Sequence, residues 1–412
     1  MITVVGTGTG APLAADVLAA ARLVVGGRRH LAAATLPDGA EQIVLGPLAP
    51  ALDTIEAYVE KGEPVVVLAS GDPGFFGIVR ALAERFGADA LDVRPGVSSV
   101  ATAFARTGLT WDDAVVVSAH GRDLRTAVNT CRAHPKVAVL TGPGAGPAEL
   151  GAALTHRTTD RVLVVASALG SGEERVERVT PAEAAARDWG TAVSVVLCLD
   201  ESRATGAVRT IAGAAVGPAQ WALDEREFEH RDSMITKFEV RALALARLGP
   251  RLGELVWDIG AGSGSVAVEC ARFGAAVTAV EKTRDGVERI RANAEAHGVD
   301  VHTVHGAAPT VLSDLDDPDA VFIGGGGREL PAIVTACARR ARRTVVVAMA
   351  ALDRVPAVRE ALGGAGFAVE GVLLQSSRLA PLPGDVTRLA ATNPVFLLWG
   401  VRPPASVEGV AQ

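Results

Sequence analysis

The sequence has few aromatic residues and few cysteines. Aromatic residues make up 4% of the 412 residues, and a single one of them is tyrosine. The cysteines show no paired spacing, which excludes a disulfide framework and a zinc motif. Scattered thiols of this kind are typical of a reducing compartment, so we expect all of them to be buried. They are Cys131, Cys198, Cys270 and Cys337.

Long apolar runs and an excess of basic charge are also absent. No apolar run reaches the length of about 20 residues that spans a membrane. The ITVVG string after Met1 lacks the basic and apolar regions of a signal peptide. The net charge of −7 does not favour nucleic-acid binding. We therefore expect a cytoplasmic protein with no membrane or nucleic-acid partner.

The chain is long and rich in small apolar residues. Hydrophobic residues make up 49% of the sequence, and there are 45 glycines. Apolar runs alternate with helical stretches, which predicts an α/β fold. The length favours two domains. A stretch of small residues without periodicity predicts a linker over 201–220, between domains at 1–200 and 221–412.

The clearest single motif lies in the second half. The apolar run Leu255–Trp257 is followed by Asp258, three glycines spaced GxGxG, a helical stretch and a strand that ends at Glu281. This order is typical of a nucleotide-binding βαβ unit, in which the acid accepts hydrogen bonds from ribose. A dinucleotide fingerprint would have glycine at position 265, where this chain has Ser265. Asp258 suits a ligand with an amino group or a positive centre. The alternative is a glycine-rich turn of another α/β domain.

The motif resembles motif I of the Rossmann-type S-adenosylmethionine (SAM) methyltransferases. Together with the strings MITKFEVRAL, HGAAP, VFIGGGG and NPVFLL it resembles the decarboxylating precorrin methyltransferases that act at C15. This likeness implies a Rossmann-like class I SAM methyltransferase domain. Ala307 replaces the acid of the family string, so the adenine amino group needs another acceptor. The implied SAM-binding residues are Thr236, Gly260, Ala261, Gly262, Ser263, Gly264, Glu281 and Ala308.

A second set of motifs fills the first half. The strings VVGTGTGAP, SGDP, PGVSS, SAHGR and VERVTPAEAAA resemble the tetrapyrrole methylase family over residues 1–200. The likeness implies two α/β subdomains with SAM between them. The implied SAM-binding residues are Pro12, Gly71, Asp72, Phe75, Ser98, Ser99, Val100 and Leu140.

Simpler roles compete with several of these assignments. Phe75 and Phe76 would also serve as core residues. Ser98 and Ser99 precede an apolar run and would also cap a helix. Thr236 would cap the predicted helix 238–248, in a capping box with Glu239.

Basic side chains provide candidate substrate contacts. Precorrins carry many carboxylates, and the arginine fork matches carboxylate geometry. The alternative for each basic residue is ordinary surface charge. Candidates in the first half are Arg28, Arg29, His30, His120 and Arg122. Candidates in the second half, for placing a carboxylate during decarboxylation, are His230, Arg231, Lys237, Arg328 and Arg378.

The two halves in this order resemble the bifunctional precorrin methyltransferases of cobalamin synthesis. The likeness implies one SAM per domain, a tetrapyrrole substrate, no metal and a homo-oligomer. It also implies methylation at C5 and C15, with loss of the C12 acetate carboxyl as CO2. Because the sulfonium of SAM is already a good leaving group, we expect orientation rather than a side-chain nucleophile. The alternatives are a nicotinamide-dependent oxidoreductase, a SAM methyltransferase of another substrate and an RNA-directed or non-catalytic module.

Overall fold

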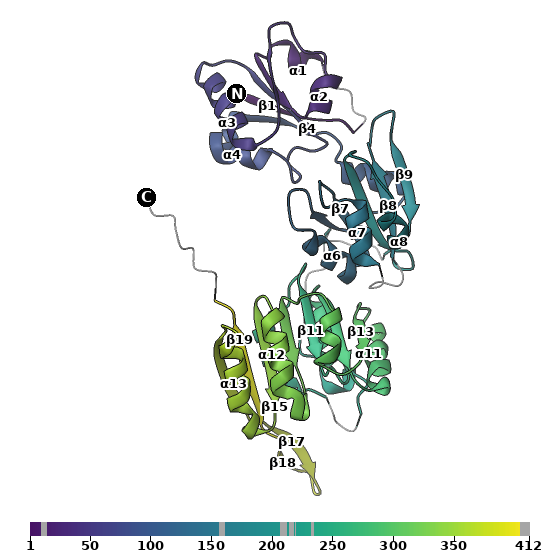
Figure 1. Ribbon diagram of the computed structural model, residues 1–412, viewed down its shortest axis with the longest axis vertical. Helices are drawn as coiled ribbons and strands as arrows, with labels where there is room; N and C mark the ends of the chain where they lie inside the picture. The colour runs from purple at the N-terminus through teal and green to yellow at the C-terminus, as the bar shows by residue number, and fades with distance from the viewer. Residues whose placement is uncertain are drawn as a thin grey trace. The chain divides into compact units, whose positions relative to one another are not determined.

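The structure is a computed structural model that describes residues 1–9, 15–155, 161–206, 212–213, 218, 220–231 and 235–403. It is α/β throughout, as predicted (Figure 1). The chain forms two compact units. The first contains Met1–Leu124 and Pro135–Gly213, and the second contains Arg125–His134 and Ala214–Gln412.

The first unit contains a five-stranded parallel sheet in the order β3-β2-β4-β1-β5. Its core strands are continuous β-branched runs because helices cover both faces. The strands are β1 (Ile2–Thr7), β2 (Leu23–Gly26), β3 (Glu41–Val44), β4 (Val65–Ser70) and β5 (Leu91–Arg94). The helices are α1 (Ala15–Ala19), α2 (Arg28–Ala33), α3 (Leu48–Glu60), α4 (Val79–Phe86) and the 3-10 turn η1 (Ala88–Ala90).

A second five-stranded sheet completes this unit, in the order β6-β7-β10-β8-β9. The fully buried β10 runs antiparallel to both of its neighbours. The apolar face of α5 packs on this sheet through Val100, Ala103 and Phe104. The elements are α5 (Ser99–Thr107), β6 (Val115–Ser118), β7 (Lys136–Leu140), α7 (Pro147–Leu154), β8 (Arg161–Ser167), β9 (Arg175–Val179), α8 (Pro181–Ala185) and β10 (Ser194–Asp200).

The second unit is built on a seven-stranded sheet in the order β13-β12-β11-β14-β15-β19-β16. Strand β19 runs antiparallel to β15 and β16. The strands are β11 (Leu255–Ile259), β12 (Ala276–Glu281), β13 (His302–His305), β14 (Ala320–Ile323), β15 (Thr344–Met349), β16 (Ala368–Leu374) and β19 (Val395–Val401). The helices are α6 (Leu124–Ala133), η2 (Glu225–Glu227), α9 (Phe238–Leu248), α10 (Ser265–Arg272), α11 (Arg284–Ala296), η3 (Thr310–Asp314), η4 (Gly327–Glu329), α12 (Leu330–Arg340), η5 (Leu352–Arg354) and α13 (Val355–Gly364).

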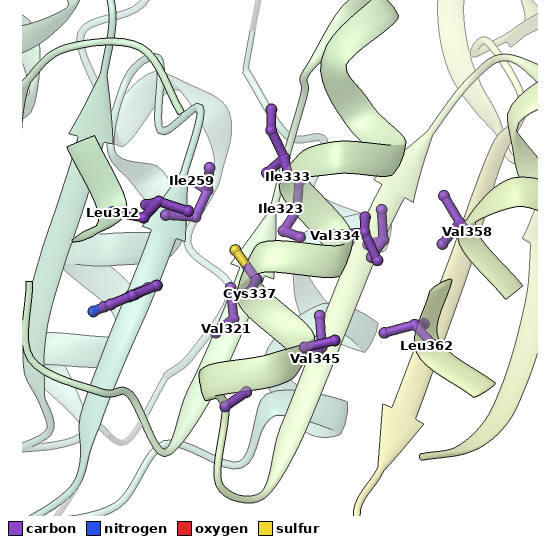
Figure 2. Packing of buried hydrophobic residues seen from close by; sticks show 14 of the residues in the cluster. Ile259, Leu312, Val321, Ile323, Ile333, Val334, Cys337, Val345, Val358 and Leu362 are labelled. Atoms are coloured by element: carbon purple, nitrogen blue, oxygen red, sulfur yellow. The ribbon is translucent and has the colours of Figure 1, made fainter. Parts of the chain in front are cut away.

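Alternate residues of the central strands face two separate cores. In β11, Trp257 and Ile259 pack toward α12, whereas Val256 packs toward α9 and α10. The period of two residues along a strand produces this division. Figure 2 shows the first core, where Val321 and Ile323 of β14 meet the buried face of α12. The four cysteines are buried and free, as expected.

A hairpin lies between β16 and β19. Pro381 and Pro383 favour a loop in this segment, but β17 (Ser377–Leu382) pairs antiparallel with β18 (Val386–Ala391). Nearly all of its residues are exposed or half-buried, so no pattern of buried residues marks either strand. Proline is tolerated because each strand of a two-stranded sheet is an edge. The turn at Gly384 and Asp385 has positive φ at both residues, which suits a tight hairpin.

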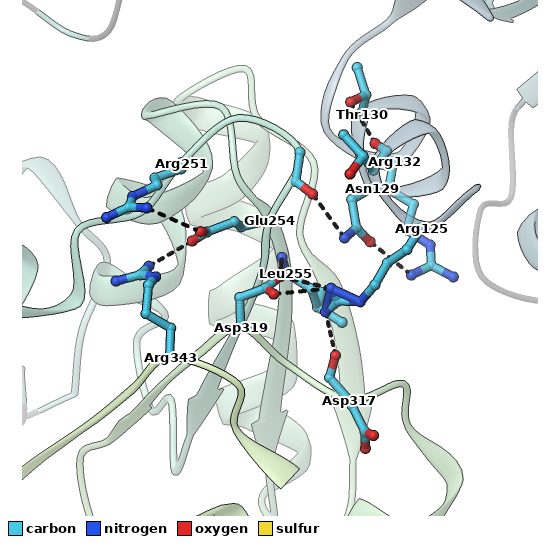
Figure 3. A network of polar contacts seen from close by, with 12 residues as sticks. Arg125, Asn129, Thr130, Arg132, Arg251, Glu254, Leu255, Asp317, Asp319 and Arg343 are labelled. Atoms are coloured by element: carbon cyan, nitrogen blue, oxygen red, sulfur yellow. Dashed lines mark hydrogen bonds and ion pairs between the residues drawn. The ribbon is translucent and has the colours of Figure 1, made fainter. Parts of the chain in front are cut away.

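A polar network fixes the loops that precede β11 and β14 (Figure 3). Arg125 of α6 lies 2.9 Å from the Asp319 carboxylate, which also accepts a 2.7 Å hydrogen bond from the Leu255 amide. Asn129 of α6 donates to the Gly253 carbonyl at 3.1 Å. Because β11 and β14 are parallel, these contacts lie at the edge of the sheet opposite the glycine loops. The network is therefore structural.

Candidate cofactor sites

The glycine loop predicted to bind SAM forms the turn between β11 and α10. The amides of Gly260 and Ala261 both donate to the Val280 carbonyl, at 2.9 and 3.1 Å. The loop after β14 lies against this turn, since a Cβ on Gly260 would come within 3.5 Å of the Gly325 nitrogen. Two glycine-rich loops thus meet at the carboxyl edge of one parallel sheet, where ligands bind in folds of this kind.

A cavity of about 570 Å³ lies over these loops. Of the residues predicted to bind SAM here, the cavity wall includes Thr236, Gly260, Ala261, Gly262 and Ser263. The other described residues of the wall are Ile235, Lys237, Val240, Gly324, Gly325, Gly326, Gly327, Leu330, Ala348, Met349, Ala350, Ala351, Arg354 and Val395. Gly264, Glu281 and Ala308 are not among the described residues of the wall.

Glu281 is held directly beside the glycine loop. One carboxylate oxygen accepts a hydrogen bond from the Gly262 amide at 3.0 Å. The other accepts from the amide and hydroxyl of Thr283, at 2.9 and 2.8 Å. The oxygen that accepts from Gly262 keeps a lone pair for a further donor, because a carboxylate oxygen accepts about two hydrogen bonds. The predicted role toward a ribose is compatible with this geometry.

Asp258 does not face the ligand cavity, contrary to the interpretation that it recognises a positive ligand. Its side chain is buried, and its carboxylate accepts a 2.9 Å hydrogen bond from the Ala267 amide of α10. Burial raises the pKa of this carboxyl to about 7, although the Ala267 hydrogen bond acts in the opposite direction. Asp258 therefore fixes the start of α10 against β11.

The capping box predicted for Thr236 is wrong. Helix α9 begins after Lys237, which occupies the N-cap position without a side-chain cap. The Phe238 amide instead donates to the Glu225 carboxylate at 3.0 Å. A carboxylate distant in sequence provides the cap, and a local motif search cannot detect it. Thr236 is left to line the cavity.

Arg378 is occupied by carboxylates of its own chain. Its guanidinium lies 2.8 Å from Glu225 and 2.7 Å from Glu239. Burial alone would raise the pKa of Glu225, but hydrogen bonds from Arg378 and the Phe238 amide lower it to about 2. Arg378 therefore attaches the β17–β18 hairpin to α9, and this contact explains it better than substrate binding does.

The other basic candidates of this unit occupy different positions. Lys237 lines the cavity. His230 is half-buried, and Arg231 and Arg328 are exposed. None of these last three is among the described residues of the cavity wall. Of the five residues proposed to place a carboxylate, Lys237 is the one among the described residues of the cavity wall.

Asn293 connects the glycine loop to the segment before α9, and sequence analysis missed it. This buried side chain of α11 donates to the Ser263 carbonyl at 2.8 Å and to the Glu229 carbonyl at 2.9 Å. Its own oxygen accepts from the Glu229 amide at 2.7 Å. All three bonds hold backbone, so the side chain sets the position of Ser263 at the cavity wall.

We expect Asn293→Asp to raise the KM for SAM in the second unit's reaction about tenfold, equivalent to ~1.4 kcal/mol of binding free energy. A carboxylate still accepts from the Glu229 amide but cannot donate to Ser263. Steady-state kinetics at saturating substrate measure this change. Asn129→Asp is the matched control, because Asn129 is also buried and also donates to a backbone carbonyl, that of Gly253 at the opposite edge of the sheet. An equal rise of KM in both variants would contradict a specific role.

In the first unit, three loops converge at the carboxyl ends of neighbouring strands β4, β1 and β5. A Cβ on Gly6 would lie 2.0 Å from the Gly71 oxygen and 2.3 Å from the Gly96 nitrogen. The Gly96 amide donates to the Gly71 carbonyl at 3.2 Å, and the Thr9 hydroxyl donates to the Val97 carbonyl at 2.7 Å. The predicted GTGTG, SGDP and PGVSS loops are thus one assembly. Predicted residue Pro12 lies outside the described residues.

The aromatic pair of this site is not in the core, so the core alternative is wrong. Phe75 and Phe76 are 37% and 49% exposed, and their rings meet edge to face at 5.0 Å. The Arg122 guanidinium lies 5.9 Å from the Phe76 ring centre. His120 contacts the Thr141 carbonyl at 3.2 Å. The SAHGR loop therefore reaches the SGDP loop through Arg122, as two parts of one exposed surface.

The serine loop combines capping with proximity to Gly71. Ser98 caps α5 by accepting from the Ala101 amide at 3.1 Å, which confirms the capping interpretation. A Cβ on Gly71 would lie 3.1 Å from the Ser99 nitrogen. The Val100 side chain is fully buried, so only its backbone could reach a ligand. Leu140 is half-buried at the end of β7. Asp72 accepts from the Gly74 amide at 2.9 Å.

The basic cluster at the start of α2 meets β4. Ser70 contacts the Arg29 guanidinium at 2.7 Å and the His30 Nε2 at 2.8 Å, whereas Arg28 is exposed. Burial, with a smaller effect from the Arg29 charge, lowers the pKa of His30 from 6.5 to about 4. His30 also lies against the first loop, because a Cβ on Gly8 would come within 2.7 Å of its ring.

We expect His30 to make the first unit sensitive to mild acid. Between pH 6.5 and about 4 the unfolded chain binds a proton at His30 that the folded chain does not. The free energy of unfolding therefore decreases as the pH falls through this range. Hydrogen exchange of peptides from 23–33 should show this loss, and His30→Gln should flatten it. His305→Gln, at an exposed position, is the control. The same pH profile in His30→Gln and the unaltered chain would contradict the prediction.

Each of the two α/β units has glycine-rich loops at the carboxyl edge of a parallel sheet. Residues 1–185 match the Tetrapyrrole (Corrin/Porphyrin) Methylases, and residues 226–398 match the Precorrin methyltransferase domain. The chain therefore belongs to the class of methyltransferases, with two different methyltransferase folds. This result confirms the predicted fold class, a tetrapyrrole methylase fold followed by a Rossmann-like domain.

The relatives define the family more closely. The chain is 40% identical over 317 residues to the precorrin-6Y C(5,15)-methyltransferase [decarboxylating] of Sinorhizobium sp, covering 76% of this chain and 74% of the relative. It belongs to the family of precorrin-6Y C(5,15)-methyltransferases (decarboxylating). Its first half is 34% identical over 209 residues to a cobalt-precorrin-7 C(5)-methyltransferase of Salmonella typhimurium, covering 49% of this chain and 100% of the relative.

A solved structure of a Geobacter metallireducens precorrin-6y C5,15-methyltransferase is 32% identical. The match covers 44% of this chain and 97% of the solved chain, with a TM-score of 0.42. In the part of the chain that the structure describes, no helix has both the length and the apolar character needed to cross a membrane.

Proposed function

We propose that this chain methylates precorrin-6Y at C5 and C15 and removes the C12 acetate carboxyl as CO2, to give precorrin-8X in cobalamin synthesis. In this proposal each unit binds one SAM, residues 1–200 methylate C5, and residues 221–412 carry out C15 methylation and decarboxylation. The observation that carries the proposal is the pair of glycine-loop sites in two units that match two different methyltransferase families.

In the second unit, the glycine loop and Glu281 hold the cofactor. When bound, SAM supplies an electrophilic methyl group with a good leaving group. The chain then has to orient a ring carbon and exclude water, which is an effect of positioning. The apolar part of the wall, with Val240, Leu330 and Met349, suits a macrocycle. Lys237, on the same wall, suits a substrate carboxylate.

Decarboxylation breaks the bond between the acetate methylene and its carboxyl carbon. The electron pair passes into the conjugated macrocycle, CO2 leaves, and the methylene carbon takes up a proton. No side-chain nucleophile is required. Lys237 places the carboxylate beside the glycine and apolar residues of the wall.

In the first unit, the convergent loops around Gly71 hold the second SAM. The exposed ring of Phe75 suits contact with a ligand, and the basic side chains of Arg29, His120 and Arg122 suit the substrate carboxylates. We further propose that the protein works as a cytoplasmic homo-oligomer. Its buried, free thiols support a reducing compartment.

Incubation with precorrin-6Y and SAM, with product mass followed over time, tests the proposal. We expect two methyl gains and one CO2 loss. Isothermal titration with SAM should give two sites per chain. Binding of NADH in place of SAM, or the absence of methyl transfer to precorrin-6Y, would contradict the proposal.

A further inference from the structure

The charge of the cavity in the second unit is one-sided. Two basic side chains, Lys237 and Arg354, stand among the described residues of its wall, and no acidic side chain does. The remaining described residues of the wall are neutral. A wall of this composition favours an anionic ligand group, because a buried or half-buried cation is stabilised by a counter-charge.

Arg354 is available for such a group. It is half-buried at the end of η5, where the chain passes from β15 into α13. Within the described residues its guanidinium has no hydrogen-bond or ion-pair partner, in contrast to Arg378 with its two carboxylates. An arginine fork with all donors unused is suited to bidentate binding of a carboxylate.

The position of Arg354 favours the substrate over the cofactor. Glu281, the expected ribose contact, ends β12, and β11 and β14 lie between β12 and β15. Three strand spacings of about 4.8 Å separate β12 from β15 by about 14 Å. Residues next to Arg354 are open to solvent, with Leu352 65% exposed. Arg354 thus lies on the cavity wall next to exposed residues, several strands away from the expected ribose contact.

We propose that Arg354 binds a carboxylate side chain of the tetrapyrrole and positions the macrocycle for reaction in the second unit. The assignment rests on the proposed function. It gives the substrate-placing role to a residue on the cavity wall, which His230, Arg231 and Arg328 do not reach in the described structure. Lys237 and Arg354 then contact two carboxylates of one substrate.

Arg354→Gln tests the assignment in the full chain. We expect the KM for the tetrapyrrole in C15 methylation to rise about 10- to 100-fold, the range for losing a hydrogen bond to a charged group. C5 methylation and the affinity for SAM, measured by titration calorimetry, should remain unchanged. Arg354→Lys should recover part of the loss, since charge returns without the fork. A purely structural role of Arg354 would not raise the KM for the tetrapyrrole while leaving the affinity for SAM unchanged.

Arg359→Gln is the matched control, because Arg359 lies on α13 at a separate hollow beside β16. Weaker SAM binding in Arg354→Gln would overturn the assignment, since the residue would then serve the methionine carboxylate. An unchanged KM for the tetrapyrrole, with normal activity of the unaltered chain, would overturn the assignment alone. Absence of methyl transfer by the unaltered chain would overturn the proposed function and the assignment with it.

Discussion

Replacement of Gly262 by aspartate is expected to reduce C15 methylation and decarboxylation by at least about 100-fold, while C5 methylation continues. Gly262 lines the cavity of the second unit and has a φ of +59°. An added Cβ would meet a single atom, the Gly260 oxygen at 4.0 Å. The aspartate side chain therefore extends into the space that the cofactor needs. A displacement of the reacting atoms by about 1 Å lowers the rate about 100-fold.

Charge adds to the steric effect of this substitution. The Gly262 amide already donates to the Glu281 carboxylate at 3.0 Å. A second carboxylate at this point would repel Glu281, and the repulsion would move the loop away from its hydrogen bond. Titration calorimetry should therefore find one SAM site per chain in the variant where the unaltered chain has two.

Gly298→Asp provides the matched control for Gly262→Asp. Gly298 also has a positive φ, +63°, and open space around its Cβ position, but it lies in the turn after α11. Gly298→Asp therefore introduces comparable backbone strain and the same new charge at a position that does not line the cavity. Loss of both methylations in a folded Gly262→Asp protein would contradict two separate sites, and retained SAM binding would contradict the loop assignment.

Much of the order of strands and helices could be predicted, because it depends on patterns among residues that are neighbours in the sequence. The strand Leu255–Trp257, the glycine turn and Glu281 follow one another in sequence, and parallel strands place their carboxyl ends at one edge. The βα alternation across both halves likewise depends on hydrophobic runs that neighbouring residues define. Family likeness added the identity of the cofactor to this framework.

The errors arose where a contact joins distant parts of the chain. Glu225 caps α9 in place of Thr236, and the same carboxylate binds Arg378 of the hairpin. Arg354 reaches the cavity from the turn after β15, about 90 residues beyond the glycine loop. No periodicity or motif reports such contacts. Asp258 illustrates a related error, because this acid beside the glycine loop accepts a hydrogen bond from the Ala267 amide and does not face the ligand cavity.

In the first unit, Gly71→Val is expected to reduce C5 methylation by at least about 100-fold and leave the C15 reaction intact. Gly71 has a φ of +58°, where a β-branched residue is strained by about 1–2 kcal/mol. Its Cβ would also come within 3.0 Å of the Val97 oxygen and 3.1 Å of the Ser99 nitrogen. Both are backbone atoms of the serine loop, which cannot move aside as a flexible side chain can.

The consequence of Gly71→Val spreads through the loop assembly. The Gly71 carbonyl accepts from the Gly96 amide, and the Gly71 amide donates to the Thr7 carbonyl at 2.9 Å. Displacing Gly71 therefore shifts the β1, β4 and β5 loops together. Product mass should show methylation at C15 and CO2 loss without the C5 methyl, and calorimetry should show one SAM site fewer.

Gly108→Val separates strain from site geometry in this test. Gly108 ends α5 with a φ of +69° and has no atom within 4 Å of its Cβ position, so the substitution adds comparable strain away from the loops. Both variants place a β-branched residue at positive φ, and Gly71→Val adds the close contacts with the serine loop. Gly71→Val alone should lose C5 methylation. If Gly108→Val lost it equally, reduced stability of the unit would explain the result, and the convergent loops would have no special role in binding SAM.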